Sequence, residues 1–419
     1  MAAATTSVYP DASEVRDGRL VIGGCDAVEL AREFGTPAYV MAEDDLRARA
    51  RELGGALAAA HGPRGDVVYA SKALPCTAVL AIFAEEGLAV DVASAGELHL
   101  ALRAGHVPER IYVHGNAKSV AELEAVAALG DATLVVDNFD EIDRLAHILE
   151  PSARQRAMVR VTPGVEADTH AAVVTGHAGS KFGFALHEAP EAIARLRALA
   201  GVELRGLHMH IGSQLFDLDA YRAAIAALAS LGDFDAYDLG GGLGVAYTTA
   251  QRAPAAAAWV QAVVGAAHEL LGARHAHLAL EPGRALVAGA GVTLYGVESV
   301  KRDIVAVDGG MSDNLRPMLY GAPYEAEVAD RFTGDGEPGT PFRLVGKHCE
   351  SGDVLATGVA LRDPRPGDVV VTPVTGAYGH ALANNYNGVP RPPVILCAGG
   401  SARAVVRRET VEDLHARDV

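Results

Sequence analysis

The residue whose type and position most clearly suggest chemistry is Lys72. It follows a short apolar run, residues 67–70, and the run ends in this lysine rather than in a turn residue. An amine at the mouth of a buried strand loses hydration, which lowers its pKa and makes it available as a nucleophile. Such an amine can hold an aldehyde as a Schiff base, which is how proteins carry pyridoxal 5'-phosphate (PLP). A surface lysine at a strand end is the simpler interpretation of Lys72 taken alone.

Polar residues also stand at the ends of the later apolar runs. The series comprises Lys72, Asp91, His114, Arg160, His208, His210, Ser213, glycines 240–242, Glu281 and Arg284. Each of these features has a simpler structural explanation by itself. Their occurrence in this order, on successive runs, is what indicates a common site.

The elements that must position these residues form a regular alternation. We expect strands at residues 66–70, 88–92, 111–114, 133–136, 157–161, 204–210, 235–239 and 277–281. Helices are expected between them, for example at 94–104, 120–128, 191–199 and 218–231. The pattern predicts a (β/α)8 barrel, whose chemistry lies at the carboxyl ends of the strands. A doubly wound open sheet is the alternative, although no GxGxxG follows the first strand.

Two of the strand ends predict a phosphate site. Gly240, Gly241 and Gly242 permit close backbone approach, and their N–H groups can cradle a phosphate. These glycines and Gly283 fall in the loops after strands seven and eight, where barrels commonly bind phosphate. Ser213 could add a hydroxyl group. A tight turn without a ligand is the alternative for the glycines.

Two other residues suit an aromatic cofactor ring. Glu281, at the end of a buried strand, could pair with a protonated ring nitrogen and keep PLP a strong electron sink. His210 is flat and could stack on the ring. A histidine satisfied within the core is the alternative interpretation of His210.

The second half of the chain predicts a β domain. Runs at 292–300, 305–308, 342–345, 368–372 and 394–397 are typical of strands separated by Gly, Pro and Asp turns, with little helix before 411–414. The first 36 residues suggest a strand pair and a helix, with Gly35 as its C-cap. We therefore expect a PLP-binding barrel at residues 37–284. Residues 1–36 and 285–419 would form a β-sandwich or β-barrel domain.

Composition restricts the class of protein. The net charge of −17 argues against nucleic-acid or anionic-membrane partners and fits a metabolic protein with a small-molecule substrate. No apolar run reaches the ~18 residues that a membrane span needs, and residues 1–10 contain no secretory signal. The four cysteines form no CxxC motif. We therefore expect a cytoplasmic protein without a cysteine-rich zinc site, and we predict no metal.

A set of motifs spans nearly the whole chain: YASKA (69–73), DVASAGEL (91–98), HGNAKS (114–119), GLHMHIGSQ (206–214), DLGGGLG (238–244), EPGR (281–284), GGMSDNLRPMLYGA (309–322), CESGDVLA (349–356), GAYGHA (376–381) and NYN (385–387). With these motifs the sequence resembles the fold-type III PLP-dependent decarboxylases, and among them the diaminopimelate decarboxylases. The resemblance implies a barrel inserted in a β domain and a head-to-tail homodimer with shared active sites.

The resemblance also implies site residues. Lys72 is similar to the Schiff-base lysine, His210 to the ring-stacking histidine and Glu281 to the partner of the pyridine nitrogen. The further cofactor contacts that it implies are Asp91, Ser213, Gly241, Gly242, Gly283, Arg284 and Tyr378. Cys349 resembles the general acid that reaches in from the second subunit, and a thiol is a reasonable proton donor near neutral pH. A small buried hydrophobe is the alternative for Cys349.

The implied reaction is decarboxylation of meso-2,6-diaminopimelate to L-lysine and CO2, the last step of lysine biosynthesis. The distal carboxylate of this substrate requires a planar, bidentate arginine. Arg316, with Tyr320 nearby in sequence, suits this role, and Glu350 would take the distal ammonium group. Arg284 and Tyr378 are further candidates for substrate contact. A solvated loop charge is the alternative for Arg316.

Other functions stay open from the sequence. A decarboxylase of ornithine, arginine or another carboxylated diamine would share the fold, although Arg316 argues against the first two. A regulatory homologue without activity is disfavoured by the presence of Lys72, Cys349 and Glu281. An enzyme similar to alanine racemase would also bind PLP, but it would give no reason for the CESGD segment.

Overall fold

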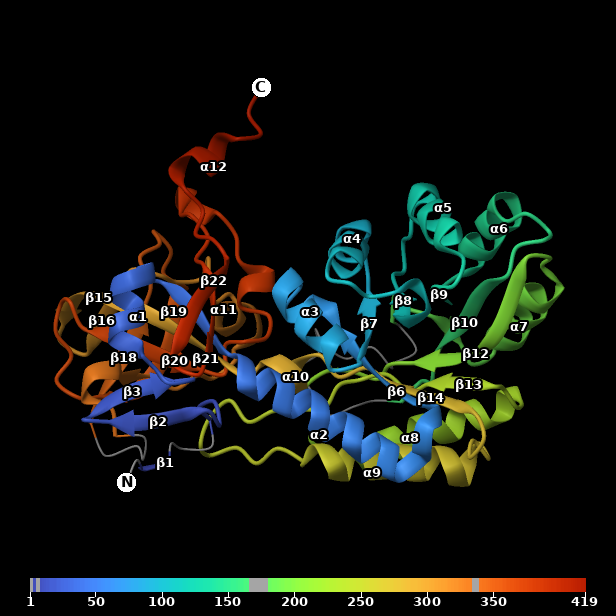
Figure 1. The fold of residues 1–419 in the computed structure, drawn as a ribbon, viewed down its shortest axis with the longest axis horizontal. Helices are drawn as coiled ribbons and strands as arrows, with labels where there is room; N and C mark the ends of the chain where they lie inside the picture. The colour runs from blue at the N-terminus through green and yellow to red at the C-terminus, as the bar shows by residue number, and fades with distance from the viewer. Residues whose placement is uncertain (1–2, 5–7, 166–179, 334–338) are drawn as a thin grey trace. The chain divides into compact units, whose positions relative to one another are not determined.

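The computed structural model describes residues 3–4, 8–165, 180–333 and 339–419 (Figure 1). The chain forms two compact units. One unit, called here the barrel unit, comprises residues 49–244 and 253–285. The other, called the β unit, comprises residues 1–48, 245–252 and 286–419. The domain limits expected from the sequence, at 36/37 and 284/285, stay predictions.

The barrel unit is built on parallel strands that close on themselves. In order, the strands are β6 (Gly65–Ala70), β7 (Ala89–Val92), β8 (Ile111–Val113), β9 (Thr133–Val136), β10 (Gln155–Thr162), β12 (Val202–Met209), β13 (Ala236–Asp238) and β14 (His277–Leu280). Each pairs in parallel with the next, and β14 pairs with β6. This closure confirms the predicted (β/α)8 barrel and excludes the open sheet. β11 (Phe184–Ala185) adds a short parallel pairing to β10.

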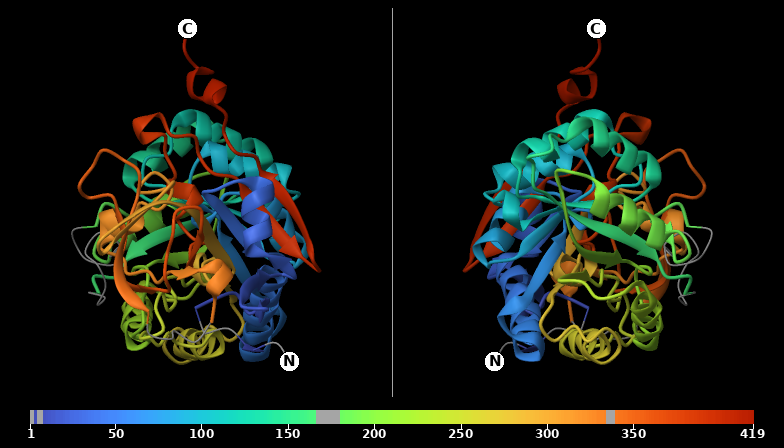
Figure 2. Two further views of the ribbon diagram at one scale, coloured as in Figure 1. Left: turned by 90° about the vertical axis from the view of Figure 1, so that its left-hand side faces the viewer. Right: turned by 90° about the vertical axis from the view of Figure 1, so that its right-hand side faces the viewer.

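Helices surround these strands (Figures 1 and 2). They are α2 (Glu43–His61), α3 (Thr77–Glu85), α4 (Ala95–Arg103), α5 (Val120–Leu129), α6 (Phe139–Ile148), α7 (Ala189–Ala198), α8 (Asp219–Leu228) and α9 (Ala256–Leu270). Polar caps fix where three of them begin, because a side-chain oxygen accepts a backbone N–H of the first turn. Ser94, Ser119 and Asn138 do this for α4, α5 and α6.

The barrel interior changes from apolar to charged along the strands. Val68, Ala89, Tyr112, Met158, Ala236 and Ala279 form one buried apolar cluster. Side chains two residues apart on a strand share a face, so the next inward layer follows two residues later. In five of the six strands that residue is titratable: Asp91, His114, Arg160, Asp238 and Glu281. The apolar layer therefore lies beneath a layer of charge.

The β unit contains two sheets. A nine-stranded sheet is made of β5 (Ala38–Ala42), β15 (Gly291–Lys301), β16 (Ile304–Val307), β17 (Glu327–Val328), β18 (Thr340–Val345), β19 (Val354–Leu361), β20 (Val369–Pro373), β21 (Val394–Ala398) and β22 (Ser401–Val406). The smaller sheet is made of β1 (Ala3–Ala4), β2 (Ser13–Arg16), β3 (Arg19–Ile22) and β4 (Cys25–Asp26). The sequence did not predict β5, β17, β19 or β22.

Short helices complete the β unit, apart from α10 (Arg284–Val287), which begins at the end of the barrel unit. They are α1 (Ala27–Phe34), α11 (Arg316–Tyr320) and α12 (Val411–His415). Helix α1 ends at Gly35, whose φ of 74° suits a glycine C-cap, as predicted. Within the described ranges, no helix has both the length and the apolar composition needed to cross a membrane.

Candidate active site

Every strand of the barrel supplies one titratable side chain at or just beyond its carboxyl end. In strand order these are Lys72, Asp91, His114, Asp137, Arg160, His208, Asp238 and Glu281. All except Lys72 are buried. Buried charges are costly unless they compensate one another, and such concentrations are typical of functional sites. We call these eight residues the charged layer.

Two histidines contact Glu281, one at each of its carboxylate oxygens. Nε2 of His208 lies 3.1 Å from its Oε2, and Nε2 of His114 lies 2.8 Å from its Oε1. The two imidazole rings meet edge to face, with centroids 4.8 Å apart. Burial alone raises the pKa of Glu281, but His114 and His208 outweigh it and hold that pKa well below its usual range. Glu281 is therefore an anion suited to a protonated ring nitrogen.

Sequence reasoning found Glu281 but not the residues that hold it. His114 and His208 were noticed at strand ends without a role, and Asp238 was only part of the glycine motif. The signal was present, because His114 and Asp238 stand two residues beyond the apolar layer, and His208 pairs in register with Arg160 and Asp238. Side chains two residues apart on a strand share a face, and comparing the inward-facing residues of neighbouring strands would have grouped these three with Glu281.

The ring of His210 is fixed by the glycine turn. Its Nδ1 accepts the N–H of Gly241 at 3.2 Å. Burial, with Lys72 and Arg160 adding to it, lowers the pKa of His210 well below its ordinary value. The imidazole is therefore neutral, with its proton on Nε2. A flat, neutral ring in a fixed orientation suits stacking against another aromatic ring.

The glycines at 240–242 are required by the packing of the chain itself. A Cβ on Gly240 would lie 2.3 Å from the carbonyl oxygen of Met209, and one on Gly241 would lie 1.9 Å from that of Glu281. The N–H of Gly240 is donated to Oδ1 of Asp238 at 3.0 Å. The sequence analysis explained these glycines by close approach to a phosphate. At Gly240 and Gly241 the structure shows a different reason: a side chain would collide with neighbouring carbonyl oxygens.

Two predicted phosphate contacts do come together. Arg284 is buried at the start of α10, and its Nη2 donates to Oγ of Ser213 at 3.1 Å. Gly283, beside Arg284, packs so closely on Ala70 that a Cβ would lie 2.9 Å from the Ala70 Cβ. A guanidinium group with a hydroxyl group beside it is a suitable receptor for an anionic oxygen.

The exposure of Lys72 differs from what its sequence position predicts. It lies in a 3-10 turn, residues 71–73, beyond the end of β6, and its side chain is exposed. The expectation that this amine is dehydrated by a buried strand is wrong for the chain as described, because the turn carries Lys72 out of the strand. Burial raises the pKa of Asp91 to about 6, although His114 and Lys72 oppose the rise. Lys72 is therefore close enough to Asp91 to act on its charge.

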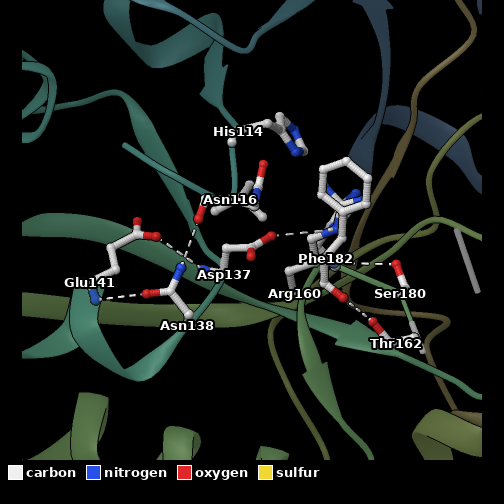
Figure 3. Close-up of polar contacts among 12 residues, drawn as sticks. His114, Asn116, Asp137, Asn138, Glu141, Arg160, Thr162, Ser180 and Phe182 are labelled. Atoms are coloured by element: carbon white, nitrogen blue, oxygen red, sulfur yellow. Dashed lines mark hydrogen bonds and ion pairs between the residues drawn. The ribbon is translucent and has the colours of Figure 1, made fainter. Parts of the chain in front are cut away.

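A rigid polar network supports one side of the barrel (Figure 3). Arg160 lies with its Nε 3.9 Å from Oδ1 of Asp137 and its guanidinium 4.5 Å from the ring centroid of Phe182. Nearby, the buried ammonium group of Lys118 donates to Oε2 of Glu141 at 3.1 Å and to two backbone carbonyl oxygens. The N–H of Asp137 is donated to Oε2 of Glu141 at 3.2 Å and joins the two pairs, and the sequence did not predict this network.

The β unit holds the predicted substrate residues. Arg316 is buried, with 5% exposure, and begins α11, which also contains Tyr320. Its guanidinium lies 4.2 Å from the ring centroid of Tyr247, and its Nη1 donates to the hydroxyl group of Tyr324. The solvated-loop interpretation of Arg316 is therefore wrong. Sequence reasoning missed both tyrosines: Tyr324 lies eight residues after Arg316, and Tyr247 comes from a distant segment.

The remaining predicted residues of the β unit lie on its surface or close to it. Cys349 and Glu350 are exposed, and the N–H of Cys349 is donated to Oδ1 of Asn387 at 3.2 Å. The alternative interpretation of Cys349 as a buried hydrophobe is thus wrong. Tyr378 is half-buried and has a φ of 58°, an unusual conformation for a non-glycine residue.

The setting of Arg316 predicts the effect of a conservative change. In Arg316→Lys we expect KM for a substrate with a distal carboxylate to rise roughly 10- to 150-fold, the equivalent of about 1.5–3 kcal/mol for a charged hydrogen bond. An ammonium group cannot reproduce the planar, bidentate geometry or the stacking on Tyr247. Steady-state kinetics would measure KM and kcat separately. Arg331→Lys, on the surface of the same unit, is the control, and an unchanged KM in Arg316→Lys would contradict the assignment.

Known proteins resemble this chain in both sequence and structure. A family model described as "Pyridoxal-dependent decarboxylase, pyridoxal binding domain" matches residues 43–288. The diaminopimelate decarboxylase of Actinosynnema pretiosum subsp. auranticum is 46% identical, over 99% of this chain and 96% of the relative. That of Bacillus subtilis strain 168 is 42% identical, over 96% and 95%. The structure of diaminopimelate decarboxylase from M. jannaschii in co-complex with L-lysine covers 98% of both chains, with a TM-score of 0.89 and 31% identity. The similarity extends well beyond the barrel unit.

Proposed function

The chain belongs to the diaminopimelate decarboxylases, a family of pyridoxal-dependent decarboxylases, and from this premise we propose that it converts meso-2,6-diaminopimelate to L-lysine and CO2. The observation that carries the proposal is the similarity to diaminopimelate decarboxylases over nearly the full chain. The proposed cofactor is PLP, and the proposed location is the cytoplasm. The free thiols of all four cysteines agree with a reducing compartment.

The residues of the barrel unit fit PLP. Arg284 and Ser213 offer a guanidinium and a hydroxyl group to its phosphate, and Glu281 is a buried anion for the ring nitrogen. His210 offers a neutral ring for stacking. We propose Gly242, Gly283 and Tyr378 as further contacts of the phosphate and Asp91 as a neighbour of the cofactor. No metal is part of the proposal.

PLP supplies an electron sink that delocalises the charge left when the carboxylate departs as CO2. Lys72 would hold the cofactor through its amine. Glu281 would keep the ring nitrogen protonated by placing an anion beside it, so that the sink would retain its positive charge. His210 would cover one face of the ring and exclude water from it.

Residues of the β unit are the proposed contacts with the distal end of the substrate. Arg316 binds the distal carboxylate in a bidentate manner, and Tyr320, on the same helix, adds a hydroxyl group. Glu350 binds the distal ammonium group, and Arg284 and Tyr378 are further candidates for contact with the substrate. The carboxylate receptor favours diaminopimelate over ornithine, which has only the distal ammonium group.

We further propose a homodimer with shared active sites, in which Cys349 of one chain donates a proton to the substrate bound in the barrel of the other. The exposure of Cys349 supports this role, because a proton donor for a second chain must lie at the surface of its own. In Cys349→Ala we expect kcat to fall by roughly 10²–10⁴, the usual contribution of a general acid. Cofactor binding should persist, because no proposed contact with PLP is removed. Cys76→Ala, a buried thiol of the barrel unit, is the matched control.

Mixing two inactive variants tests the shared site directly. Random exchange of Cys349→Ala with Lys72→Ala makes half of the dimers hybrid, and each hybrid has one of its two sites intact. We therefore expect the mixture to recover about a quarter of the native activity, as two-fold symmetric sites require. Failure to recover activity, despite verified hybrid dimers, would show that Cys349 and Lys72 act within one chain.

The function itself is tested by a substrate panel. The PLP-loaded protein is incubated with meso-2,6-diaminopimelate, ornithine and arginine, and CO2 and amine products are measured together. The proposal expects equimolar CO2 and L-lysine from diaminopimelate and a much lower kcat/KM for the other two. Preference for ornithine or arginine would support the alternative decarboxylases, and product without CO2 would support a racemase-like enzyme.

A further inference from the structure

Two buried carboxyl groups of the charged layer stand side by side. Asp238, at the end of β13, has an exposure of 0%, and one of its carboxyl oxygens lies within 4.8 Å of a carboxyl oxygen of Glu281. We propose that Asp238 and Glu281 share one proton, which resides on Asp238, so that the pair presents a single negative charge at Glu281. Asp238 is then a positioning residue for the acid that faces the cofactor ring, an inference that rests on the proposed function.

Two arguments from geometry require a proton between these groups. Oδ1 of Asp238 already accepts the N–H of Gly240, and two carboxylates offer each other only acceptors, so a favourable contact between these neighbouring groups needs a proton on one of them. Two like charges at this separation in a buried site also repel strongly, which is why such pairs ionise in separate steps. In addition, Oδ2 of Asp238 has no donor among the described residues, a deficit that a proton on this carboxyl group removes.

The distribution of donors decides which group keeps the proton. Glu281 has Nε2 of His208 at 3.1 Å and Nε2 of His114 at 2.8 Å, one at each of its oxygens. Among the described residues, Asp238 receives only the N–H of Gly240, at 3.0 Å. The anion is more stable where more donors converge, which is at Glu281. Burial, followed by the charge of Glu281, raises the pKa of Asp238 well above its ordinary value, in agreement with this assignment.

His208 does not supply the missing positive charge. Burial lowers the pKa of His208 to about 3, so this ring is a neutral donor through Nε2 at physiological pH. The other titratable or charged groups that interact with Glu281 are Asp91, Tyr112, His114, Arg160 and His210. Arg160 is the permanent cation of this set and is already paired with Asp137, and Asp91 is a second acid. A doubly ionised Asp238–Glu281 pair would therefore add a negative charge that these groups do not balance.

An isosteric substitution discriminates the two protonation states. The amide of Asp238→Asn can accept from Gly240 through Oδ1 and donate to Glu281 through Nδ2, as a protonated aspartate does. Infrared spectra of the cofactor-free protein at pH 8 should contain the carbonyl stretch of a protonated carboxyl group, and this band should be lost in Asp238→Asn. Asp91→Asn is the control, because Asp91, with a pKa of about 6, is ionised at this pH. A band that survives in Asp238→Asn, or no such band in the native protein, overturns the inference.

A second readout uses the bound cofactor. In PLP-loaded Asp238→Asn, we expect the affinity for PLP to stay within about threefold of native. The pH at which the bound PLP changes its absorbance should shift by less than half a unit, since the charge at Glu281 is unchanged. Asp238→Leu cannot donate to Glu281, and we expect its affinity to fall at least about tenfold. A shift of one unit or more in Asp238→Asn would mean that Asp238 is ionised.

The two proposals can fail independently. Native protein that binds no PLP would end the proposed function, while the infrared measurement on the cofactor-free protein would still decide the shared proton. Conversely, an active decarboxylase whose infrared spectrum is unaffected by Asp238→Asn would retain the function and refute the proton on Asp238.

Discussion

In Lys72→Ala we expect kcat with meso-2,6-diaminopimelate to fall by at least about 10⁴-fold, because the residue that we propose holds the cofactor covalently is lost and nucleophilic groups contribute on this scale. The protein should still fold, since Lys72 is exposed and lies in a short turn beyond β6. The visible band of a Schiff base, present when the native protein is loaded with PLP, should be absent. Absorbance and steady-state kinetics on the same samples would measure both effects.

Lys72→Arg separates charge from nucleophilicity. The guanidinium keeps a positive charge near Asp91 and His210, but it is not a nucleophile at neutral pH. We therefore expect Lys72→Arg to lose activity as completely as Lys72→Ala. Lys181→Ala, a lysine outside the charged layer, should retain native activity. Substantial turnover in Lys72→Arg would mean that another amine binds the cofactor.

The second large effect is expected from Glu281→Gln. Removing one preorganised electrostatic partner costs roughly 10²–10³ in kcat, and we expect a loss of this size. The amide carries no charge, so it cannot keep the ring nitrogen protonated, and the donors on His114 and His208 lose their anion. The loss should appear in kcat rather than in KM, because we assign Glu281 to the cofactor ring and Arg316 to the substrate.

A matched carboxylate tests whether the effect is specific. Glu141 is also buried and is paired with Lys118, but it belongs to the supporting network and not to the charged layer. Glu141→Gln should lower stability, because it leaves the Lys118 ammonium group without its counter-ion, yet kcat of the folded protein should stay near native. Equal losses of kcat in the two variants would show that Glu281 acts only through the integrity of the fold.

The strand ends were predictable because they follow local rules. Short apolar runs fixed the eight barrel strands to within two residues at each end, and the barrel rule then placed Lys72, Asp91, His210 and Glu281 at one face. The C-cap at Gly35 was predictable for the same reason. In the β unit, β19 and β22 were missed because their runs contain Gly, Arg or Ala in place of a continuous β-branched pattern.

Contacts between distant segments could not be read from local patterns. Tyr247 stacks on Arg316 from a segment about 70 residues earlier in the chain, and only the fold joins them. Cys25 and Cys397 likewise have no sequence signal, yet both are buried, and burial together with the neighbouring Cys25 raises the pKa of the Cys397 thiol. The exposure of Lys72 was also unpredictable, since it depends on a single 3-10 turn rather than on the strand before it.

The most direct test of the account is to locate the covalent bond to the cofactor. The PLP-loaded protein is reduced with borohydride, digested and examined by mass spectrometry for the modified lysine. The account predicts one modified peptide, with the pyridoxyl group on Lys72 and none on Lys118 or Lys181. A pyridoxyl group on any other lysine, or no modified peptide from a fully loaded sample, would contradict it.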